Sequence, residues 1–471
     1  MKQVCIQGLG FVGLAMAIAL SNVKTAKGNT KYFVTGVDLP TEQGLKKIAA
    51  VNSGILPFNT ADQKMVTAFL EAKKVGNLVA TTDESTYELA DIVIVDLPLD
   101  VALVDGDIQL DMPGFGLAIR TVARKIKPGA LILIETTVPP GTCEKVIWPI
   151  ICDELEKREI DKDLVYLAHS FERVMPGIGY YDSLVNYWRV YAGRTNRAAD
   201  ICEEFLSTLI NVDKYPLKRL ASMTASEATK VLENTYRAVN IAFIDEWTKY
   251  SELIGIDLYE IVDAVRVRPT HSNIRLPGLG VGGYCLTKDP LFALASLGSL
   301  FNIDGPEFVF SKLAMEVNQK MPLHAVRRLS SLMNNELEKK NILVMGVSYK
   351  GDIGDSRFSP SELLVRTLKA RGAHVMCFDP FLSYWSEMEQ PLLSDFPDTD
   401  EYEAVVFATA HSQFYELDVL TWLKGNRPVV LDAVNVISNF PVLCFTIDLI
   451  IASVFAVNAV PVLAVAVIAT F

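Results

Sequence analysis

The feature that most constrains the fold is a glycine-rich turn between a strand pattern and a helix pattern. The apolar run KQVCIQ is typical of a buried strand, GLGFVG supplies Gly8, Gly10 and Gly13, and FVGLAMAIALSNV is typical of a helix. A second strand pattern, KYFVTGVD, ends in Asp38, which lies 25 residues beyond Gly13. In this context glycines admit a pyrophosphate at a helix N-terminus, and a carboxylate accepts hydrogen bonds from a ribose.

This arrangement predicts a dinucleotide-binding domain that prefers NAD to NADP, because the Asp38 carboxylate would repel a 2′-phosphate. A tight turn without a ligand is the alternative, and the complete fingerprint argues against it. The residues expected at the cofactor are Gly8, Leu9, Gly10, Phe11, Val12, Gly13 and Asp38.

The remaining strand and helix patterns extend the α/β interpretation over most of the chain. The strand patterns DIVIVDLP, ALILIETT and DLVYLAH follow in the first third, and NILVMGVSYK, HVMCFDP, EAVVFAT and PVVLDAV in the last third. Between them, no Gly or Pro interrupts the chain from Ala225 until Gly255, which predicts one long helix. We therefore expect an α/β fold with two Rossmann-like doubly wound domains joined by a central long-helix domain.

The expected domain boundaries follow these changes of pattern. They give a NAD-binding domain at 1–202, a central helical domain at 203–325, a C-terminal Rossmann-like domain at 326–440 and an apolar tail at 441–471. From Leu449 to Phe471 the tail has no charged residue and is long enough to span a membrane. Its Asn458 and Pro461, and the lack of a close basic flank, favour a buried or irregular extension, with membrane contact left open.

Composition excludes several classes of protein. The chain has 471 residues, half of them hydrophobic, and a formal charge of −12 without a basic cluster, so we expect no nucleic-acid partner. Its seven cysteines are odd in number and far apart, which indicates free thiols in a reducing compartment rather than a disulfide framework or a metal site. The strand pattern begins at residue 2, so no signal peptide is expected, and the expected location is the cytoplasm.

A second glycine-rich stretch, PGLGVGGYCLTKDP, presents Cys285 just ahead of Lys288 and Asp289. A lone cysteine is usually a small buried hydrophobe. Here the glycines and the adjacent charges favour a nucleophile, because a nearby ammonium stabilises the thiolate.

Several motifs occur together in order: GLGFVG, GVD, ETTVPPGT, ERVMPG, EATKVLEN, PGLGVGGYCLTKDP and GVSYKGDIGDSRFSPS. In these motifs the chain resembles the UDP-glucose/GDP-mannose dehydrogenase family of nucleotide-sugar dehydrogenases, from residue 2 to about residue 437. The resemblance implies an N-terminal NAD domain, a central dimerisation domain and a C-terminal domain for the UDP part. It also implies NAD-dependent oxidation of a UDP-sugar C6 alcohol to the uronate in two hydride transfers, in a cytoplasmic homodimer or higher oligomer that makes polysaccharide precursors.

The resemblance also implies residue roles. Cys285 would be the nucleophile that carries a thiohemiacetal and then a thioester. The other catalytic groups would be Lys230, Asn234, Asp289, Glu172 and Thr137. Further cofactor contacts would come from Pro98, Thr137, Lys288 and Arg357. The substrate would be bound by Glu172, Arg173, Lys230, Asn234, Arg268, Leu276, Gly278, Gly280, Gly282 and Lys350.

The chain departs from the family pattern at two positions, since Leu99 stands where Thr-Pro chemistry is common and Phe171 replaces a usual proline. Arg173 follows the motif residue Glu172. The form ERVMPG resembles the N-acetylhexosamine branch, so UDP-GlcNAc or UDP-ManNAc is the expected substrate and UDP-glucose the alternative.

The residues alone leave two rival functions open. In a two-electron dehydrogenase of the same architecture Cys285 would be structural, and a catalytically silent nucleotide-sugar-binding protein would need none of the chemistry. Lys230 also suits a surface ion pair with Glu227 or Glu233, and Arg266 and Arg268 suit either a phosphate or solvent.

Overall fold

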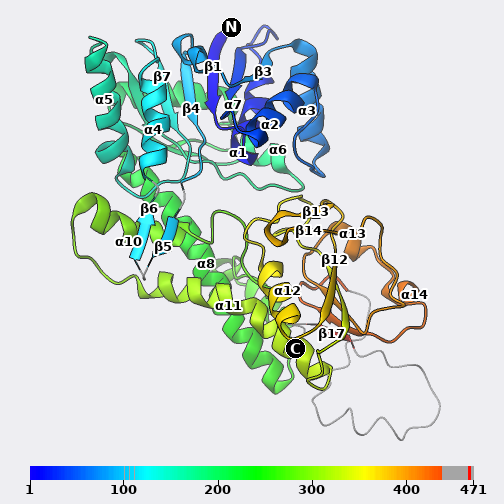
Figure 1. Cartoon of the computed structure of the whole chain (residues 1–471). Helices are drawn as coiled ribbons and strands as arrows, with labels where there is room; N and C mark the ends of the chain where they lie inside the picture. The colour runs from blue at the N-terminus through cyan, green and yellow to red at the C-terminus, as the bar shows by residue number, and fades with distance from the viewer. Residues whose placement is uncertain (100, 105–106, 111, 438–464, 468–471) are drawn as a thin grey trace, which may run out of the picture. The chain divides into compact units, whose positions relative to one another are not determined.

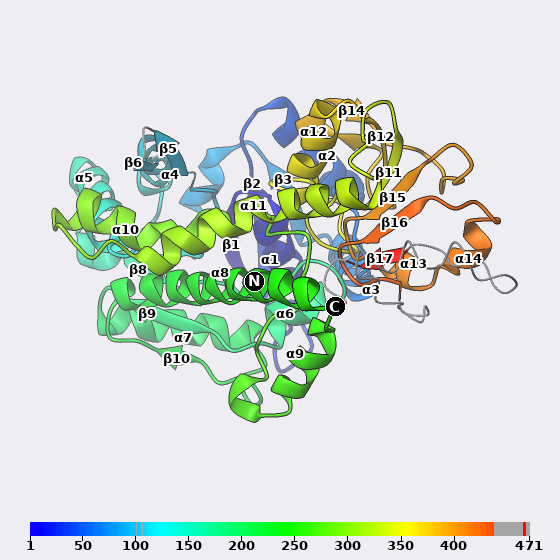
Figure 2. The ribbon, with the colours of Figure 1, turned by 90° about the horizontal axis from the view of Figure 1, so that it is seen from below.

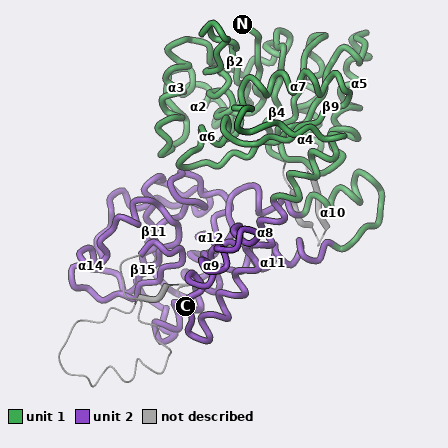
Figure 3. The backbone as a smooth tube through the Cα atoms, turned by 180° about the vertical axis from the view of Figure 1, so that it is seen from behind, with its two compact units in different colours: residues 1–233, 291–307 green, residues 234–290, 308–471 purple. Residues whose placement is uncertain are grey.

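The computed structural model describes residues 1–99, 101–104, 107–110, 112–437 and 465–467. The chain divides into two compact units (Figure 3). Unit 1 comprises residues 1–233 and 291–307, and unit 2 comprises residues 234–290 and 308–471.

Unit 1 is built on an eight-stranded sheet in the order β10-β9-β8-β7-β4-β1-β2-β3 (Figure 1). The pairings from β8 to β3 are parallel, whereas β9 runs antiparallel to β8. Its strands are β1 (Lys2–Gln7), β2 (Tyr32–Val37), β3 (Leu78–Thr81), β4 (Ile92–Val95), β7 (Leu131–Ile134), β8 (Tyr166–His169), β9 (Val190–Gly193) and β10 (Lys218–Arg219).

The central strands are buried on both faces, which is why they are continuous apolar runs. Along β4, Ile92 and Ile94 join one hydrophobic cluster, while Val93 and Val95 join another on the opposite face. Each cluster is closed by helices, so the sheet is covered on both sides. The helices of unit 1 are α1 (Phe11–Ser21), α2 (Glu42–Ser53), α3 (Gln63–Val75), α4 (Met112–Ala123), α5 (Trp148–Lys157), α6 (Tyr180–Val185), α7 (Asn196–Leu209) and α10 (Phe292–Ser296).

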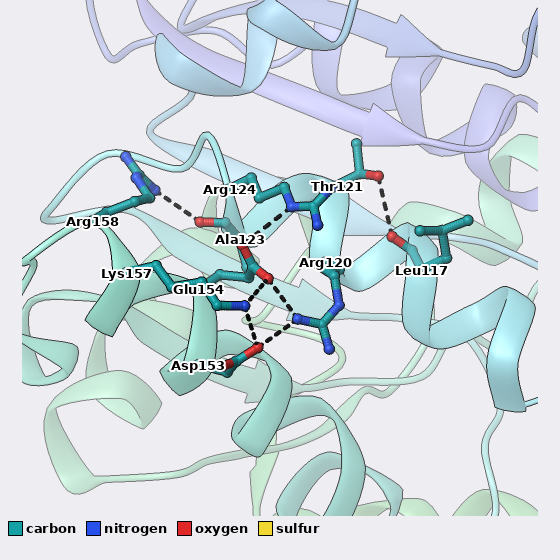
Figure 4. Close-up of polar contacts among 9 residues, drawn as sticks. All are labelled: Leu117, Arg120, Thr121, Ala123, Arg124, Asp153, Glu154, Lys157 and Arg158. Atoms are coloured by element: carbon teal, nitrogen blue, oxygen red, sulfur yellow. Dashed lines mark hydrogen bonds and ion pairs between the residues drawn. The ribbon is translucent and has the colours of Figure 1, made fainter.

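An ionic cluster joins α4 to α5 on the surface of unit 1 (Figure 4). Glu154, nearly buried, accepts hydrogen bonds from Arg120, Arg124 and Lys157. Asp153 also accepts from Arg120 and Lys157. The three cations offset the negative charges of the two carboxylates. Burial of an unpaired Glu154 carboxylate would be costly. A short antiparallel hairpin, β5 (Val101–Val104) and β6 (Asp107–Leu110), precedes α4.

Unit 2 contains a five-stranded parallel sheet in the order β12-β11-β15-β16-β17. Its strands are β11 (Asn341–Met345), β12 (His374–Phe378), β15 (Ala404–Phe407), β16 (Val429–Asp432) and β17 (Val465–Val467), with a separate hairpin of β13 (Tyr384–Trp385) and β14 (Gln390–Pro391). Its helices are α9 (Leu258–Arg266), α11 (Val309–Leu332), α12 (Pro360–Ala370), α13 (Ser412–Tyr415) and α14 (Val419–Trp422).

The long helix α8 (Met223–Ile254) begins in unit 1 and continues in unit 2. It ends where Gly255 adopts a φ of 73°, a left-handed conformation that glycine takes without steric cost. Within unit 2 it runs beside α11 (Figure 2), and Asn318 of α11 donates a hydrogen bond of 3.0 Å to the Ala238 carbonyl of α8.

The predicted α/β fold and the long helix are confirmed. Strand β9, which lies one strand inside the edge strand β10, runs antiparallel to β8. The expected boundary at residue 202 falls inside α7, and the domain bounds stay predictions. Apart from 465–467, the tail at 441–471, with Cys444, lies outside the described residues. Within those residues, no helix combines the length and apolar character that crossing a membrane requires.

Candidate functional site

The glycine-rich turn of unit 1 has the shape that a dinucleotide needs. Gly8 adopts a φ of 100°. A Cβ built on Gly13 would lie 2.0 Å from the Gly8 carbonyl oxygen, so any side chain at Gly13 would clash with the backbone of the turn. Apart from its neighbours along the chain, no atom of the described residues lies within 4 Å of a Cβ built on Gly10. Gly10 is also the N-cap of α1 and supplies no side chain there, so the helix N-terminus is left to a ligand.

Asp38 stands at the end of β2 beside this turn. Its Oδ2 accepts a hydrogen bond of 3.3 Å from the Leu9 amide and lies 3.1 Å from Lys47 Nζ, while its Oδ1 accepts one of 2.8 Å from the Leu39 amide. The neighbouring Phe11 packs against Phe58, with ring centroids 5.2 Å apart, and its carbonyl accepts a hydrogen bond from the Tyr180 hydroxyl. The predicted cofactor residues of the turn are therefore together in unit 1.

A partly buried carboxyl group lies next to the turn. Asp96 follows β4, its Oδ2 is out of contact with solvent, and its Cβ would be 3.2 Å from a Cβ on Gly13. Burial, and then the neighbouring Glu135 carboxylate, raise the pKa of Asp96 well above its usual range. Glu135 is ion-paired with the buried Arg189. Two carboxyls beside one guanidinium therefore favour a protonated Asp96, a group that sequence reasoning missed.

Lys230 and Glu172 meet in unit 1. Lys230 is buried and donates a hydrogen bond of 2.7 Å to the Glu172 carbonyl, and its Nζ lies 3.7 Å from Glu172 Oε1. The Phe171 ring lies under two cations, 5.4 Å from Lys230 Nζ and 5.0 Å from the Arg173 guanidinium. Phe171 thus gives the Lys230 ammonium an aromatic face, which accounts for this departure from the family pattern.

The surface-pair interpretation of Lys230 is wrong, because its carboxylate neighbour is Glu172. Glu233 pairs instead with Arg173, which also donates to the Trp188 carbonyl. Glu227 points to the loop after β7, where it accepts hydrogen bonds of 2.6 Å from the Gly141 amide and 2.7 Å from the Cys143 amide.

Glu227 therefore ties the loop that carries Thr137 to the first turns of α8, three residues before Lys230. Burial is the main cause that raises the pKa of Glu227 to about 7. Thr137 itself is half-buried, and it is the adjacent Thr136 whose hydroxyl accepts a hydrogen bond of 2.9 Å from the Leu97 amide. Pro98 is exposed. Leu99 is buried in the core, and its apolar side chain cannot make the hydrogen bonds of a threonine hydroxyl.

In unit 2, Cys285 lies in a turn just before a short 3₁₀ helix at Asp289–Leu291. Of the six cysteines that the structure describes, Cys285 is the exposed one. The Cys285 carbonyl accepts hydrogen bonds of 3.2 Å from the Lys288 amide and 2.9 Å from the Asp289 amide, which fix the turn. The sulfur is thus presented to solvent by a closed backbone loop.

Asp289 is fully buried behind this turn and organises two neighbouring side chains. Its Oδ2 accepts a hydrogen bond of 2.7 Å from Asn234 Nδ2, and its Oδ1 lies 2.7 Å from Lys288 Nζ. Lys288 Nζ also lies 4.3 Å from the centre of the Tyr284 ring. The structure therefore brings Asn234, Lys288 and Asp289 together within unit 2, as the sequence predicted for the residues around Cys285.

The glycine run before Cys285 is explained by packing within the chain. A Cβ on Gly282 would lie 2.7 Å from Tyr349 Cβ and 2.8 Å from the Phe358 carbonyl oxygen, and one on Gly280 would lie 2.8 Å from Pro360 Cβ. The atoms that approach these glycines come from the loop after β11, at Tyr349 and Phe358, and from Pro360 at the start of α12. The predicted contact of these glycines with a sugar diphosphate stays a prediction. Gly278 has open space at its Cβ position within the described residues.

The loop after β11 carries Lys350 and Arg357. Arg357 forms a bidentate pair with Asp355, at 2.9 and 2.7 Å, and this hydrogen bond is the main cause that raises the pKa of Arg357, with a smaller contribution from the Cys285 thiol. Burial lowers the pKa of Lys350, and the positive charge of Arg237 lowers it further. The positive charges of Lys350 and Arg237 lie near each other and suit an anionic ligand. Sequence reasoning missed Arg237.

Two further residues expected to bind the substrate, Arg268 and Leu276, lie in an exposed segment of unit 2. Arg268 is exposed beside the short turn Pro269–His271, and Leu276 is exposed in the segment that follows. Arg266 donates hydrogen bonds of 2.8 and 3.2 Å to the Ile274 carbonyl, so its guanidinium supports this segment rather than standing free for a phosphate.

Comparison with known proteins gives one consistent result. The NAD binding domain of the UDP-glucose/GDP-mannose dehydrogenase family matches residues 2–210, its central domain residues 224–320 and its UDP binding domain residues 343–439. The chain belongs to the UDP-glucose/GDP-mannose dehydrogenase family. It is therefore a nucleotide-sugar dehydrogenase, an oxidoreductase that uses NAD.

Similar members of the family cover nearly the whole chain. A UDP-N-acetyl-D-mannosamine dehydrogenase of Methanocaldococcus jannaschii is 30% identical over 93% of this chain and 93% of its own. A UDP-N-acetyl-D-glucosamine 6-dehydrogenase of Pseudomonas aeruginosa is 26% identical over 88% and 91%. The solved structure of a UDP-D-ManNAc dehydrogenase from Pyrococcus horikoshii superposes with a TM-score of 0.78 at 28% identity, covering 94% of this chain and 97% of that one.

The family's NAD fits the residues of unit 1. The close Gly8–Gly13 approach would provide the turn, the open position at Gly10 would admit the pyrophosphate, and the Asp38 carboxylate would accept hydrogen bonds from the ribose. In the described part of the chain, no group of three or more His, Cys, Asp or Glu side chains suits a metal ion.

Proposed function

We propose that this dehydrogenase oxidises the C6 alcohol of a UDP-N-acetylhexosamine, UDP-ManNAc or UDP-GlcNAc, to the uronate, and that Cys285 carries the sugar between the oxidation steps. The observation that carries the proposal is the exposed Cys285 thiol in a turn backed by the buried Asn234–Asp289–Lys288 group. The product would be a uronic acid precursor for polysaccharides. UDP-glucose is the second candidate substrate.

The chemistry divides into two oxidations. NAD, which the turn at Gly8–Gly13 and Asp38 would hold, would supply the hydride acceptor for each, so two equivalents would take up the four electrons. In the first step C6 loses a hydride and its hydroxyl passes a proton to water, which leaves an aldehyde. Lys230 serves as the donor for the developing oxyanion, since its buried ammonium is held by the Glu172 carbonyl and the Phe171 ring.

The second oxidation needs a tetrahedral carbon, because the aldehyde hydrogen can leave as hydride only after a nucleophile has added to the carbonyl. The Cys285 thiolate adds to the aldehyde carbonyl and forms a thiohemiacetal, which becomes a thioester when its hydride leaves. Arg357 interacts electrostatically with Cys285, and its positive charge favours the thiolate. Lys288, three residues after Cys285, is proposed to add to this effect although its ammonium is paired with Asp289. Asp289 acts as a positioning residue, because its two oxygens hold Asn234 and Lys288.

Hydrolysis ends the cycle. Water adds to the thioester carbonyl, the C–S bond breaks, and the uronate and the free Cys285 thiol are released together with a proton. Glu172 and Thr137 are the groups proposed to position this water and to take the proton. Glu172 is nearly buried and accepts a hydrogen bond from the Val174 amide, which fixes its carboxylate.

The choice of an N-acetylhexosamine rests on two supports. The similar proteins are a UDP-N-acetyl-D-mannosamine dehydrogenase and a UDP-N-acetyl-D-glucosamine 6-dehydrogenase. The ERVMPG motif is the form that resembles this branch, and its Arg173 is held in place by Glu233.

We also propose that the protein forms a homodimer through α8. Five exposed large side chains recur on one side of this helix at spacings of three, four or seven residues: Tyr236, Phe243, Trp247, Tyr250 and Ile254. This set, the apolar stripe, matches the helical repeat. An exposed stripe of this kind is typical of an interface between copies of a chain.

The test is a panel of UDP-sugars supplied with NAD, in which NADH formed per sugar is counted. The proposal expects two NADH per sugar, a product that has gained one oxygen and lost two hydrogens, and faster turnover of UDP-ManNAc or UDP-GlcNAc than of UDP-glucose. One NADH per sugar would indicate a two-electron dehydrogenase with a structural Cys285, and binding without NADH would indicate a silent binding protein.

A further inference from the structure

A lysine of α2 lies beside the carboxylate that receives the adenosine ribose. Lys47 Nζ is 3.1 Å from Asp38 Oδ2, the oxygen that also accepts the Leu9 amide. The side chains are partly shielded, with 28% of Lys47 and 13% of Asp38 exposed. Charges in such a place interact more strongly than fully solvated ones.

The adjacent Lys46 shows that this contact is specific to one position on α2. Successive residues of a helix point about 100° apart, so the two lysines face different surroundings. Lys46 pairs with Glu42 of its own helix, and both of those side chains are mostly exposed.

We propose that Lys47 is a cofactor-specificity residue that reduces the discrimination between NAD and NADP. An ionised Asp38 alone repels a 2′-phosphate. With an ammonium 3.1 Å away, the pair carries no net charge, and Lys47 has a donor to offer a phosphate. The preference for NAD that remains then comes from the hydrogen bonds of Asp38 to the ribose hydroxyls.

The proposal rests on the assigned NAD binding and on neither the sugar nor Cys285. Its test therefore uses the full chain without any sugar. NADH and NADPH are titrated into the wild-type protein, Lys47→Met, Lys47→Arg and the control Lys46→Met, and dissociation constants are read from nicotinamide fluorescence.

Removing the Lys47 charge leaves Asp38 uncompensated, so the ratio of the NADPH to the NADH dissociation constant is expected to rise about tenfold in Lys47→Met. Added salt is expected to shrink the rise. Lys47→Arg and Lys46→Met are expected to keep the wild-type ratio. A merely structural role would weaken both cofactors together.

The proposal is overturned if Lys47→Met leaves the ratio at the Lys46→Met value, or if it weakens NADH and NADPH equally. Asp38→Asn supplies an independent variant, since Lys47 then stands without its partner carboxylate. That change is expected to lower the ratio below the wild-type value, and an unchanged or higher ratio would also contradict the proposal.

Discussion

Cys285 is the side chain on which the proposed chemistry depends most directly. It is exposed, whereas Cys5, Cys143, Cys202 and Cys377 are buried among the described residues. Burial raises the pKa of the Cys5 thiol to about 11 and that of Cys377 to about 12, so these thiols stay protonated and inert near neutral pH. Among the six described cysteines, the exposed sulfur is therefore that of Cys285, near Arg357.

Cys285→Ser is expected to bind NADH normally and to lose steady turnover by about three orders of magnitude or more, because a serine hydroxyl without a dedicated base is a weak nucleophile. The measurements are NADH per site and the mass of the protein after mixing with NAD and UDP-sugar. Cys152→Ser, at a half-buried cysteine, is the matched control and is expected to stay active. Two NADH per sugar at wild-type rate in Cys285→Ser would remove this residue from the mechanism.

Glu227 gives a pH dependence to stability. Its pKa is about 7 in the folded protein, above the ordinary value of 4.5, mainly because of burial. Below pH 4.5 it is protonated in both states, and as the pH rises towards 7 the unfolded chain releases the proton first. Its contribution to stability is therefore present at low pH and is lost as the pH rises through 7, on the order of 3 kcal/mol.

Glu227→Gln is expected to flatten this part of the dependence between pH 5 and about pH 8. It also lowers stability at all pH values, because its amide has one acceptor for the two amides of Gly141 and Cys143. Denaturant unfolding across this pH range measures both effects. The exposed Glu144 provides the control Glu144→Gln, and a slope in Glu227→Gln equal to that of the control would contradict the assignment.

Among the secondary-structure elements, α8 carries both predicted catalytic residues and the apolar stripe. Its buried positions hold Lys230 in unit 1 and Asn234 in unit 2, while the apolar stripe is exposed. Within the stripe, the rings of Trp247 and Tyr250 pack edge to face at 5.5 Å, which gives this side of the helix a preformed aromatic surface. The helix therefore carries predicted catalytic residues in both units and, as proposed, an interface for a second copy in unit 2.

Trp247→Glu is expected to shift the protein from dimer to monomer, because a charge at the centre of an apolar interface is left without compensation. Analytical ultracentrifugation over a range of concentrations gives the dissociation constant. Leu117→Glu, at an exposed leucine of α4, is the control and is expected to remain dimeric. A monomeric wild type, or a dimer unaffected by Trp247→Glu, would show that the stripe has another role.

For the whole molecule, the three family domains end at residue 439 and every motif discussed lies before that point. The described part of the tail, β17, adds three residues to the edge of the unit 2 sheet beside β16. An edge strand of this length contributes little to a core that α11, α12 and the inner strands already close.

Truncation after Asn439 is therefore expected to leave turnover and NADH per sugar unchanged in a folded dimer. Steady-state assays and ultracentrifugation of the shortened and full chains make the comparison. Loss of activity in a shortened chain that remains folded and dimeric would contradict the expectation. Partition of the full chain, but not the shortened one, into lipid vesicles would support membrane contact through the tail.

The sequence by itself determined the features that depend on local order along the chain. Buried strands such as β4 are continuous apolar runs, α8 extends as far as Gly255, and the glycines at 8, 10 and 13 follow a spacing that only one kind of turn uses. Strands without such a signal were missed. The strands β5 and β6 are short, and β10 has two charged residues and no apolar alternation.

What only the tertiary structure decided is which groups face each other across long separations in sequence. Lys230 could pair with neighbours on its own helix, yet the fold gives it Glu172, 58 residues away. The glycines before Cys285 likewise meet Tyr349 and Pro360, more than 60 residues further along the chain. Helix and strand periodicity specify a residue's face, whereas the partner on that face is set by how the elements pack, which no local pattern encodes.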